Sequence, residues 1–140
     1  MNSDPEEPVL VDSSAWIDYL RGDDSRARRE IRRLVADRAT LATTEPILME
    51  LLAGARDEAG LEKLERLCDS MKQLEVDPRL DHRAAAGIFR ATRRRGVTVR
   101  KLADCLVAAV AIRHGVALVH KDADFEAIAS CVALRHVSLR

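Results

Sequence analysis

The stretch PVLVDSSAW, residues 8–16, is the part of the sequence that decides the fold. Residues 9–11 are three consecutive apolar side chains, a pattern typical of a short strand that is buried on both faces. Asp12 follows this run directly, and the hydroxyls of Ser13 and Ser14 precede a helical pattern. The carboxylate therefore stands at the end of a buried strand, where it either caps the next helix or belongs to a functional site.

Short apolar segments alternate with helical patterns along the rest of the chain. Further strands are predicted at 40–44, 73–76, 116–120 and 133–137, and helices at 13–21, 24–37, 45–53, 58–71, 81–95, 100–114 and 122–129. Apolar strands separated by helices indicate a parallel sheet with both faces covered. We expect an α/β fold in three layers, α/β/α, with a central parallel sheet of four to five strands and helices on both faces. Residues 8–140 would form this single domain, after a flexible N-terminal tail at 1–7.

The composition is that of a globular protein and argues against two kinds of RNA-binding surface. Of the 140 residues, 47% are hydrophobic and 33% are charged, a balance that supports one buried core. The formal net charge is zero, so the chain as a whole has no electrostatic attraction for nucleic acid. Only 3% of the residues are aromatic, which argues against a platform that stacks RNA bases.

The cysteines and the N-terminus bear on the cellular compartment. Three cysteines without CxxC spacing predict neither disulfides nor a thiolate zinc site, and they indicate a reducing environment. The N-terminal sequence is acidic and carries two prolines, unlike a signal peptide. No stretch approaches the roughly 18 consecutive apolar residues that a membrane span requires. We therefore expect a cytoplasmic protein without membrane association.

Asp104 is a second acid in apolar surroundings, within KLADCLVAAVAIRHG, residues 101–115. Asp104 and Arg113 are nine positions apart and so point to opposite sides of the predicted helix. Arg113 is close to the helix end and can reach solvent, whereas Asp104 shares its side with Ala108 and Ala111. Small residues on that side allow neighbouring elements to approach closely. We expect the Asp104 carboxylate to lie inside a cleft.

Three further acids have an ordinary structural interpretation when each is taken alone. Glu50 is the only polar residue between Ile47 and Ala53, and a single Glu on a helix more often marks its solvent-facing stripe. Asp122 and Asp124, in the segment LVHKDADF, follow another predicted strand. One of this pair is expected to cap the next helix.

Taken together, these acids predict a metal site. Ligands of open α/β sheets bind outside the carboxyl ends of the strands, where Asp12 and Asp122 both fall. Glu50 and Asp104 lie on helices that we expect to pack near the same edge. Four carboxylates brought together would repel and raise one another's pKa unless a cation lay among them. Oxygen ligands without His or Cys suit Mg²⁺ or Mn²⁺ rather than zinc.

Four segments, in this order, resemble the PIN-domain nucleases, and most closely the VapC-type toxins of bacterial toxin–antitoxin pairs. They are VLVDSSAWIDYL, EPILMELLAG, KLADCLVAAVAIRHG and LVHKDADFEAIA, which together cover nearly the whole chain. The family's acids are matched by Asp12, Glu50, Asp104, Asp122 and Asp124, and its supporting hydroxyl by Ser13. His120 departs from the pattern, because relatives usually carry a small hydroxyl residue at this position.

The resemblance implies a PIN-like domain and a Mg²⁺- or Mn²⁺-dependent endoribonuclease that acts as a toxin. The implied partners are an RNA substrate, with tRNA favoured, a small VapB-type antitoxin, and a second copy of the chain in a homodimer. The implied catalytic acids are Asp12, Glu50, Asp104 and Asp122, and the implied metal ligands are Asp12, Asp104, Asp122 and Asp124. Glu50 would be an outer ligand of the metal or would orient the attacking water. The alternative is a PIN-like module that binds RNA or protein with weak or no catalysis.

Residues 90–101 contain six basic side chains and no acid. Taken alone, such a run is typical of a solvated helix face. The run immediately precedes the helix that carries Asp104, however, and an acidic site repels RNA unless nearby cations hold the phosphates. The candidate RNA-binding residues are Arg93, Arg94, Arg95 and Arg100.

A separate apolar group on the helix of Glu50 bears on association. It consists of Ile47, Leu48, Leu51 and Leu52. Exposed apolar groups of this kind usually mark partner surfaces, so we predict that this group forms a surface for a second copy or for the antitoxin. If they are internal, they belong to the core.

Overall fold

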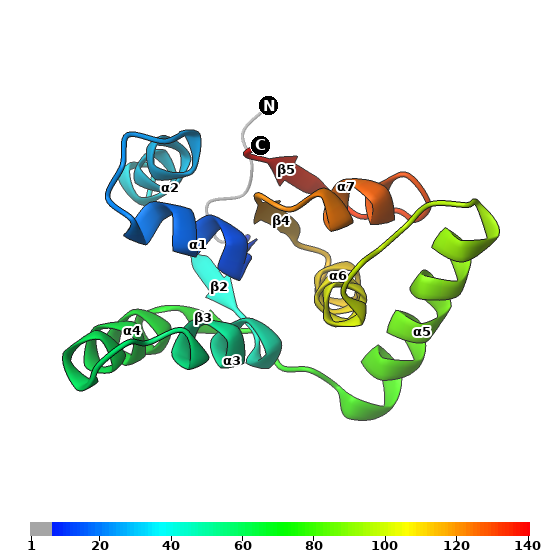
Figure 1. Cartoon of the computed structure of the whole chain (residues 1–140), viewed down its shortest axis with the longest axis horizontal. Helices are drawn as coiled ribbons and strands as arrows, with labels where there is room; N and C mark the ends of the chain where they lie inside the picture. Colours follow the sequence, from blue (N-terminus) through cyan, green and yellow to red (C-terminus); the bar gives the residue numbers. More distant parts are fainter. Residues whose placement is uncertain (1–6) are drawn as a thin grey trace.

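A five-stranded sheet runs through the centre of the molecule in this computed structural model, which describes residues 7–140 (Figure 1). The predicted tail at 1–7 lies outside the described residues, except for Glu7. The strand order is β3-β2-β1-β4-β5, and every neighbouring pair is parallel. The strands are β1 (Val9–Val11), β2 (Leu41–Thr43), β3 (Lys72–Gln73), β4 (Ala117–His120) and β5 (His136–Ser138).

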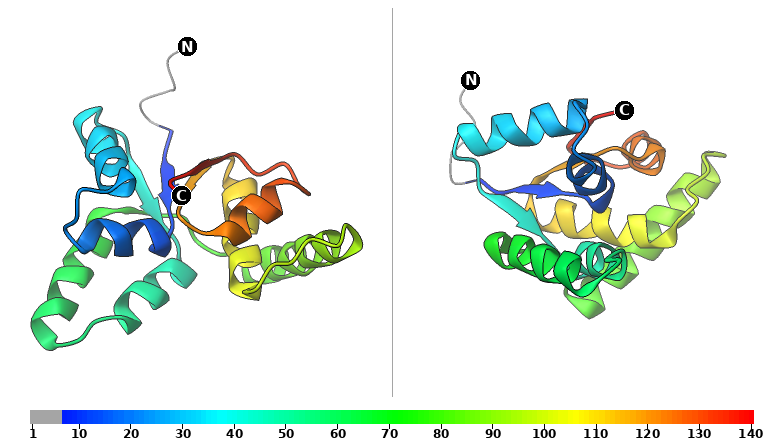
Figure 2. Two further views of the ribbon diagram at one scale, coloured as in Figure 1. Left: turned by 45° about the horizontal axis from the view of Figure 1, so that its top comes forward. Right: turned by 60° about the vertical axis from the view of Figure 1, so that its left-hand side comes forward.

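Seven helices in the described part of the chain surround this sheet. They are α1 (Ser13–Leu20), α2 (Arg26–Ala36), α3 (Glu45–Ala53), α4 (Glu58–Ser70), α5 (Pro78–Arg94), α6 (Leu102–His114) and α7 (Ala123–Ala129). Helices α1 and α2 lie on one side of β1 and α6 lies on the other (Figure 2). The predicted three-layer α/β/α fold, with its sheet of four to five parallel strands, is confirmed. Within residues 7–140, no helix combines the length and the apolar character needed to cross a membrane.

Helix α6 is buried between its neighbours, which fixes the position of Asp104 in its first turn. It packs against α3, α5, α7 and β4. Its buried apolar residues are Cys105, Val107, Ala108, Ala109, Val110 and Ala111. Gly115 ends the helix with a φ of 67°, in the left-handed region that glycine adopts without steric cost.

The carboxyl ends of β1 and β4 lie side by side at the point where the order of the strands in the sheet reverses. From β1 the chain moves outward to β2 and β3, whereas β4 and β5 lie on the other side of β1. Val11 pairs with Val119, and the N–H of Asp12 donates to the carbonyl of Val119 at 2.9 Å. Open α/β sheets bind ligands in the crevice at such a point.

The largest differences from the predicted boundaries lie around β3, around α5 and at β5, which begins at His136, three residues later than predicted. Strand β3 covers only two residues, not four: the N–H of Leu74 still donates to the carbonyl of Thr43 at 2.8 Å, but the N–H of Val76 donates to the Glu45 carboxylate at 2.8 Å. Helix α5 begins at Pro78, three residues earlier than predicted. The Asp77 carboxylate caps it by accepting the N–H groups of Arg79 and Leu80, and proline at the first helical position needs no N–H partner.

The apolar residues of α3 are mostly internal, so the prediction that they form a partner surface is wrong for two of the four. Ile47 is 1% exposed and Leu51 is 3% exposed. Leu48 and Leu52 are partly buried against the core. The reason is that α3 packs against α1, α4 and α6, so little of its circumference is left for solvent.

Candidate active site

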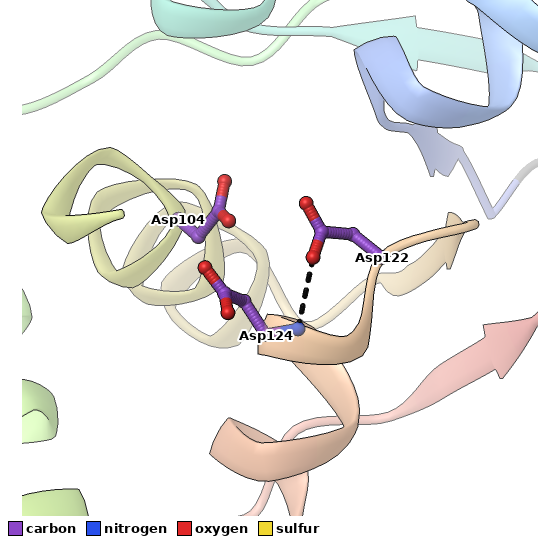
Figure 3. A group of neighbouring side chains, drawn as sticks. All are labelled: Asp104, Asp122 and Asp124. Atoms are coloured by element: carbon purple, nitrogen blue, oxygen red, sulfur yellow. Dashed lines mark hydrogen bonds between the residues drawn. The ribbon is translucent and has the colours of Figure 1, made fainter. Parts of the chain in front are cut away.

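Three carboxylates from α6 and from the start of α7 meet beside the sheet. Asp104, Asp122 and Asp124 are all buried, and one carboxylate oxygen from each lies within 4.8 Å of the others. The Asp122 and Asp124 side chains point toward α6, which carries Asp104 (Figure 3). The structure therefore brings together three of the four predicted metal ligands, as expected for acids at the carboxyl edge of a parallel sheet.

Asp122 both caps α7 and faces the other acids. Its Oδ1 accepts the N–H of Asp124 at 2.9 Å, which satisfies one of the free N–H groups at the helix start. The prediction that one acid of the pair caps this helix is confirmed. The capping geometry and a functional role are compatible, because the cap uses Oδ1 and leaves Oδ2 toward the acid cluster.

Asp124 fixes the segment that leads into α6. Its Oδ1 accepts the N–H of Arg100 at 3.1 Å and its Oδ2 accepts the N–H of Lys101 at 3.0 Å. Burial acts to raise the pKa of Asp124, but these N–H groups and a hydrogen bond with Asp104 outweigh it and lower the pKa. Since both oxygens already accept hydrogen bonds, Asp124 is less available to a metal than Asp104 is.

Of these three acids, Asp104 lies in the least favourable environment for a negative charge. It is 2% exposed, and its Oδ2 has no hydrogen-bond partner. Burial is the main reason that the pKa of Asp104 rises to about 8, followed by the hydrogen bond with Asp124 and the negative charge of Asp12. A buried carboxylate oxygen without a partner, facing two other carboxylates, is a fitting ligand for a hard divalent cation.

Asp12 borders this group from the start of α1. Its Oδ2 accepts both the N–H of Ser14 at 3.0 Å and the hydroxyl of Ser14 at 2.6 Å. The same hydroxyl accepts the N–H of Lys121 at 2.9 Å, so Ser14 joins Asp12 to the segment after β4. Burial raises the pKa of Asp12, and the charges of Glu50 and Asp122 add to the rise against the Ser14 hydrogen bonds. Asp12 therefore caps α1, and its charge acts on Asp104, although its carboxylate is not one of the three that lie within 4.8 Å of one another.

Glu50 is connected to the same edge through Ser13. The Ser13 hydroxyl donates to Glu50 Oε2 at 2.5 Å, although the two residues are 37 positions apart. Glu50 is half-buried, and its charge contributes to the raised pKa of Asp12. The interpretation of Glu50 as part of a purely solvent-facing stripe is wrong, because a neighbouring helix supplies a specific donor.

Lys101 is a residue of the site that the sequence reasoning did not assign. Its Nζ lies 3.2 Å from Asp122 Oδ2 and 4.0 Å from Asp104 Oδ2. Its position three residues before Asp104, at the helix start, is a sequence signal for such a pair. Arg100 also lies near the acids, with guanidinium nitrogens 3.6 Å from Asp122 and from Asp124. Both cations reduce the repulsion within the acidic group.

His120, which departs from the family pattern, accepts a hydrogen bond from the backbone of Asp122. It is fully buried, and its Nδ1 accepts the N–H of Asp122 at 3.1 Å. Because Nδ1 accepts, Nε2 carries the proton and donates to Nδ1 of His136 at 2.9 Å. Burial, followed by the neighbouring His136, lowers the pKa of His120 to about 4. The imidazole is therefore neutral at physiological pH and acts as a hydrogen-bond bridge between β5 and the Asp122 loop.

The other predicted RNA-binding arginines lie at the end of α5, which projects from the molecule (Figure 2). Arg93 and Arg94 line a surface hollow together with Arg90. The Arg93 guanidinium also lies over the Phe89 ring. Arg95 follows the helix and donates to the carbonyl of Ser130 at 2.9 Å. The basic residues therefore form two groups. Arg93 and Arg94 belong to the one at the end of α5, whereas Arg100 lies with Lys101 beside the acids.

Comparison with known proteins identifies the family. The PIN domain family model matches residues 9–130. VapC ribonuclease Mb1587 of Mycobacterium bovis and ribonuclease VapC11 of Mycobacterium tuberculosis are each 50% identical over 133 residues, which cover 94% of this chain and 99% of the relative.

Solved structures agree in fold. The toxin–antitoxin complex VapBC2 from Rickettsia felis, bound to a promoter DNA fragment, matches with a TM-score of 0.75 at 15% identity, over 95% of this chain and 99% of that chain. Mycobacterium tuberculosis VapC20, described as a toxin that cleaves the sarcin–ricin loop, matches with a TM-score of 0.62 at 24% identity, over 91% of this chain and 98% of that chain. The chain therefore belongs to the PIN-domain family and, within it, to the VapC group.

Proposed function

We propose that this protein is a Mg²⁺- or Mn²⁺-dependent endoribonuclease that serves as the toxin of a toxin–antitoxin pair. The observation that carries the proposal is the buried Asp104 Oδ2, which lacks a hydrogen-bond partner and lies in a group with Asp122 and Asp124. The ribonuclease relatives, 50% identical over almost their whole length, support the same activity. A binding module without catalysis would not need to keep such a group of buried acids.

The residues fit a divalent cation by their chemistry. Asp104 and Asp122 would hold it directly, and Asp12 and Asp124 would complete the ligands, directly or through water. When bound, the ion would lower the pKa of a ligated water and balance the charge that develops on the phosphate. The burial of Asp104 supports this arrangement, since a buried carboxylate oxygen without a partner is costly unless a cation satisfies it.

Glu50 would position the attacking water and accept its proton. The Ser13 hydroxyl holds one carboxylate oxygen of Glu50 and leaves the other free to accept a hydrogen bond. Ser14 in turn holds Asp12 and the segment after β4 in a fixed relation. Such outer hydrogen bonds orient the groups that do the chemistry, and they keep the orientation when the substrate arrives.

The RNA phosphates would be held by Arg93, Arg94, Arg95 and Arg100. Planar guanidinium groups match the geometry of phosphate oxygens, and two of these four arginines, Arg93 and Arg94, line the hollow at the end of α5 together with Arg90. We propose tRNA as the favoured substrate, to be cleaved in the cytoplasm. Because the related VapC20 is described as cleaving the sarcin–ricin loop, ribosomal RNA is the informative comparison substrate.

A VapB-type antitoxin and a homodimer are the proposed protein partners. Several solved structures of this fold are complexes of a toxin with its antitoxin. An apolar hollow, which Ile17, Leu20 and Leu64 line together with Glu50, would suit an antitoxin segment that also blocks the site. Met49, next to Glu50, is 64% exposed and extends the apolar surface.

The activity can be tested with purified protein and end-labelled tRNA and ribosomal RNA fragments. We expect cleavage with Mg²⁺ or Mn²⁺, none with a chelator, and a loss of at least about a hundredfold in Asp104→Asn, as is typical when a group central to catalysis is removed. Asp37→Asn, which changes an exposed carboxylate that follows α2 and pairs with Arg33, is the matched control. RNA binding without cleavage under all these conditions would favour the alternative of a PIN-like binding module.

A further inference from the structure

Lys101 is the residue that the proposed mechanism leaves unexplained. It stands at the cap position of α6, and its Nζ reaches Asp122 Oδ2 at 3.2 Å. Its backbone is held in place, because Asp124 Oδ2 accepts its N–H at 3.0 Å. Asp124 therefore holds the backbone of Lys101, while the ammonium of Lys101 pairs with Asp122.

The ammonium also lies near a second acid of the site. Its second neighbour is Asp104 Oδ2, at 4.0 Å, the buried oxygen without a hydrogen-bond partner. Although burial opposes it, the charge of Asp104 and the hydrogen bond with Asp122 raise the pKa of Lys101, so the side chain stays charged. The positive charge offsets part of the repulsion among the acids.

The same two oxygens would be ligands of the proposed metal ion. An Mg²⁺ ion binds carboxylate oxygens at about 2.1 Å, so an ion shared by Asp104 and Asp122 would lie within about 5 Å of Nζ, which is itself 4.0 and 3.2 Å from these oxygens. Two cations this close together repel each other strongly. The Lys101 side chain is 52% exposed, so it is free to turn outward when an ion arrives.

We propose that Lys101 is an internal counter-ion of the acidic group, which occupies the place of the cation in the metal-free protein and is displaced when Mg²⁺ or Mn²⁺ binds. This inference rests on the proposed metal site and deepens it. Its consequence is that Lys101 weakens metal binding and, at the same time, stabilises the metal-free protein.

The test is calorimetric titration with Mg²⁺ at pH 8.5, where protons compete least with the metal. Lys101→Met removes the charge but keeps a chain of similar length, and we expect it to bind Mg²⁺ about tenfold more tightly, the lower end of what one close charge contributes. Lys101→Arg keeps the charge and should bind like wild type. Lys63→Met, which removes an exposed lysine on α4, controls for the change in net charge.

Thermal unfolding gives a readout that does not depend on catalysis. Without metal, Lys101→Met should unfold at a lower temperature than wild type and Lys63→Met, and saturating Mg²⁺ should raise its unfolding temperature more than it raises theirs. Equal or weaker Mg²⁺ binding by Lys101→Met, with wild-type binding intact, would overturn the counter-ion proposal alone. Absence of Mg²⁺ binding in wild type and in every variant would instead overturn the proposed metal site, and the inference with it.

Discussion

The Ser13 hydroxyl donates a 2.5 Å hydrogen bond to Glu50 and so connects the first residue of α1 with α3. The bond fixes the direction of a half-buried carboxylate that helix geometry alone would leave free to turn into solvent. Substitution of Ser13 therefore tests the role of Glu50 directly, because the serine can be changed without altering any charge.

Ser13→Ala should reduce RNA cleavage while leaving RNA binding nearly unchanged. Loss of an outer hydrogen bond of this kind typically costs 10–100-fold in activity, and we expect a fall in this range, in kcat rather than in KM. Ser13→Thr, which keeps the hydroxyl, should recover most of the activity. Single-turnover cleavage at saturating protein measures the cleavage rate of both variants. Equal rates for Ser13→Ala and the wild-type protein would mean that the Ser13 hydroxyl is not needed to orient Glu50.

The metal-free protein should lose stability as the pH rises from about 6.5 to about 8. The pKa of Asp104 is about 8 in the folded chain, well above the ordinary 3.8 of an unfolded one, so the folded state holds a proton that the unfolded state has already lost. Raising the pH removes this proton from a buried group and disfavours the folded state. Chemical denaturation in the presence of a chelator, at several pH values, measures the slope.

Asp104→Asn provides the control for that pH dependence. The amide cannot ionise, so the slope between pH 6.5 and 8 should flatten, and the metal-free variant should be no less stable than wild type at pH 8. A variant that keeps the wild-type slope would show that other groups cause it. Added Mg²⁺ should stabilise wild type but not the variant, since the proposed ligand is gone.

His120 should give the opposite pH dependence, at lower pH. Its pKa is about 4 when folded and about 6.5 when unfolded, so the stability it contributes is lost as the pH falls from 6.5 toward 4. The Asp104→Asn background removes the opposing contribution of that acid in this range. In that background, His120→Asn should weaken the loss of stability on acidification, because asparagine does not titrate.

The two substitutions of His120 also separate its structural contribution. Asparagine can still accept the N–H of Asp122 through its side-chain oxygen, whereas leucine cannot. His120→Leu should therefore cost about 1–3 kcal/mol more at pH 7, the range expected for a buried donor left without a partner. Equal unfolding free energies for the two variants would argue against the bridge between His136 and the Asp122 loop.

Arg93→Ala combined with Arg94→Ala should weaken RNA binding by about the same factor for all sequences. Each lost phosphate contact lowers the dependence of log affinity on log salt by roughly one unit. Ca²⁺ in place of Mg²⁺ limits cleavage during the measurement, and Arg66→Ala on α4 serves as the exposed control. If affinity and salt dependence match wild type, RNA lies elsewhere, and Arg32 on α2 is the next arginine to change.

The sequence by itself determined the order of the elements and the edge of the sheet to which the acids belong. Apolar runs and helical periodicity depend on neighbours in the chain, so β1, β4 and the helices that follow them were predictable within a few residues. Since strands that are all parallel bring their carboxyl ends to one edge, Asp12 and Asp122 could be placed together before any distance was known.

Only the tertiary structure decided what each polar side chain contacts. Arg113 points away from Asp104, as helix periodicity predicts, but its pairing with the buried Asp81 of α5 depends on how two helices pack. The carboxylate of Asp124 accepts backbone N–H groups more than 20 positions away. Likewise, the ammonium of Lys101 reaches Asp122 only because α6 begins beside α7. Such partners are set by packing across the fold, where the spacing of residues along the chain carries no information.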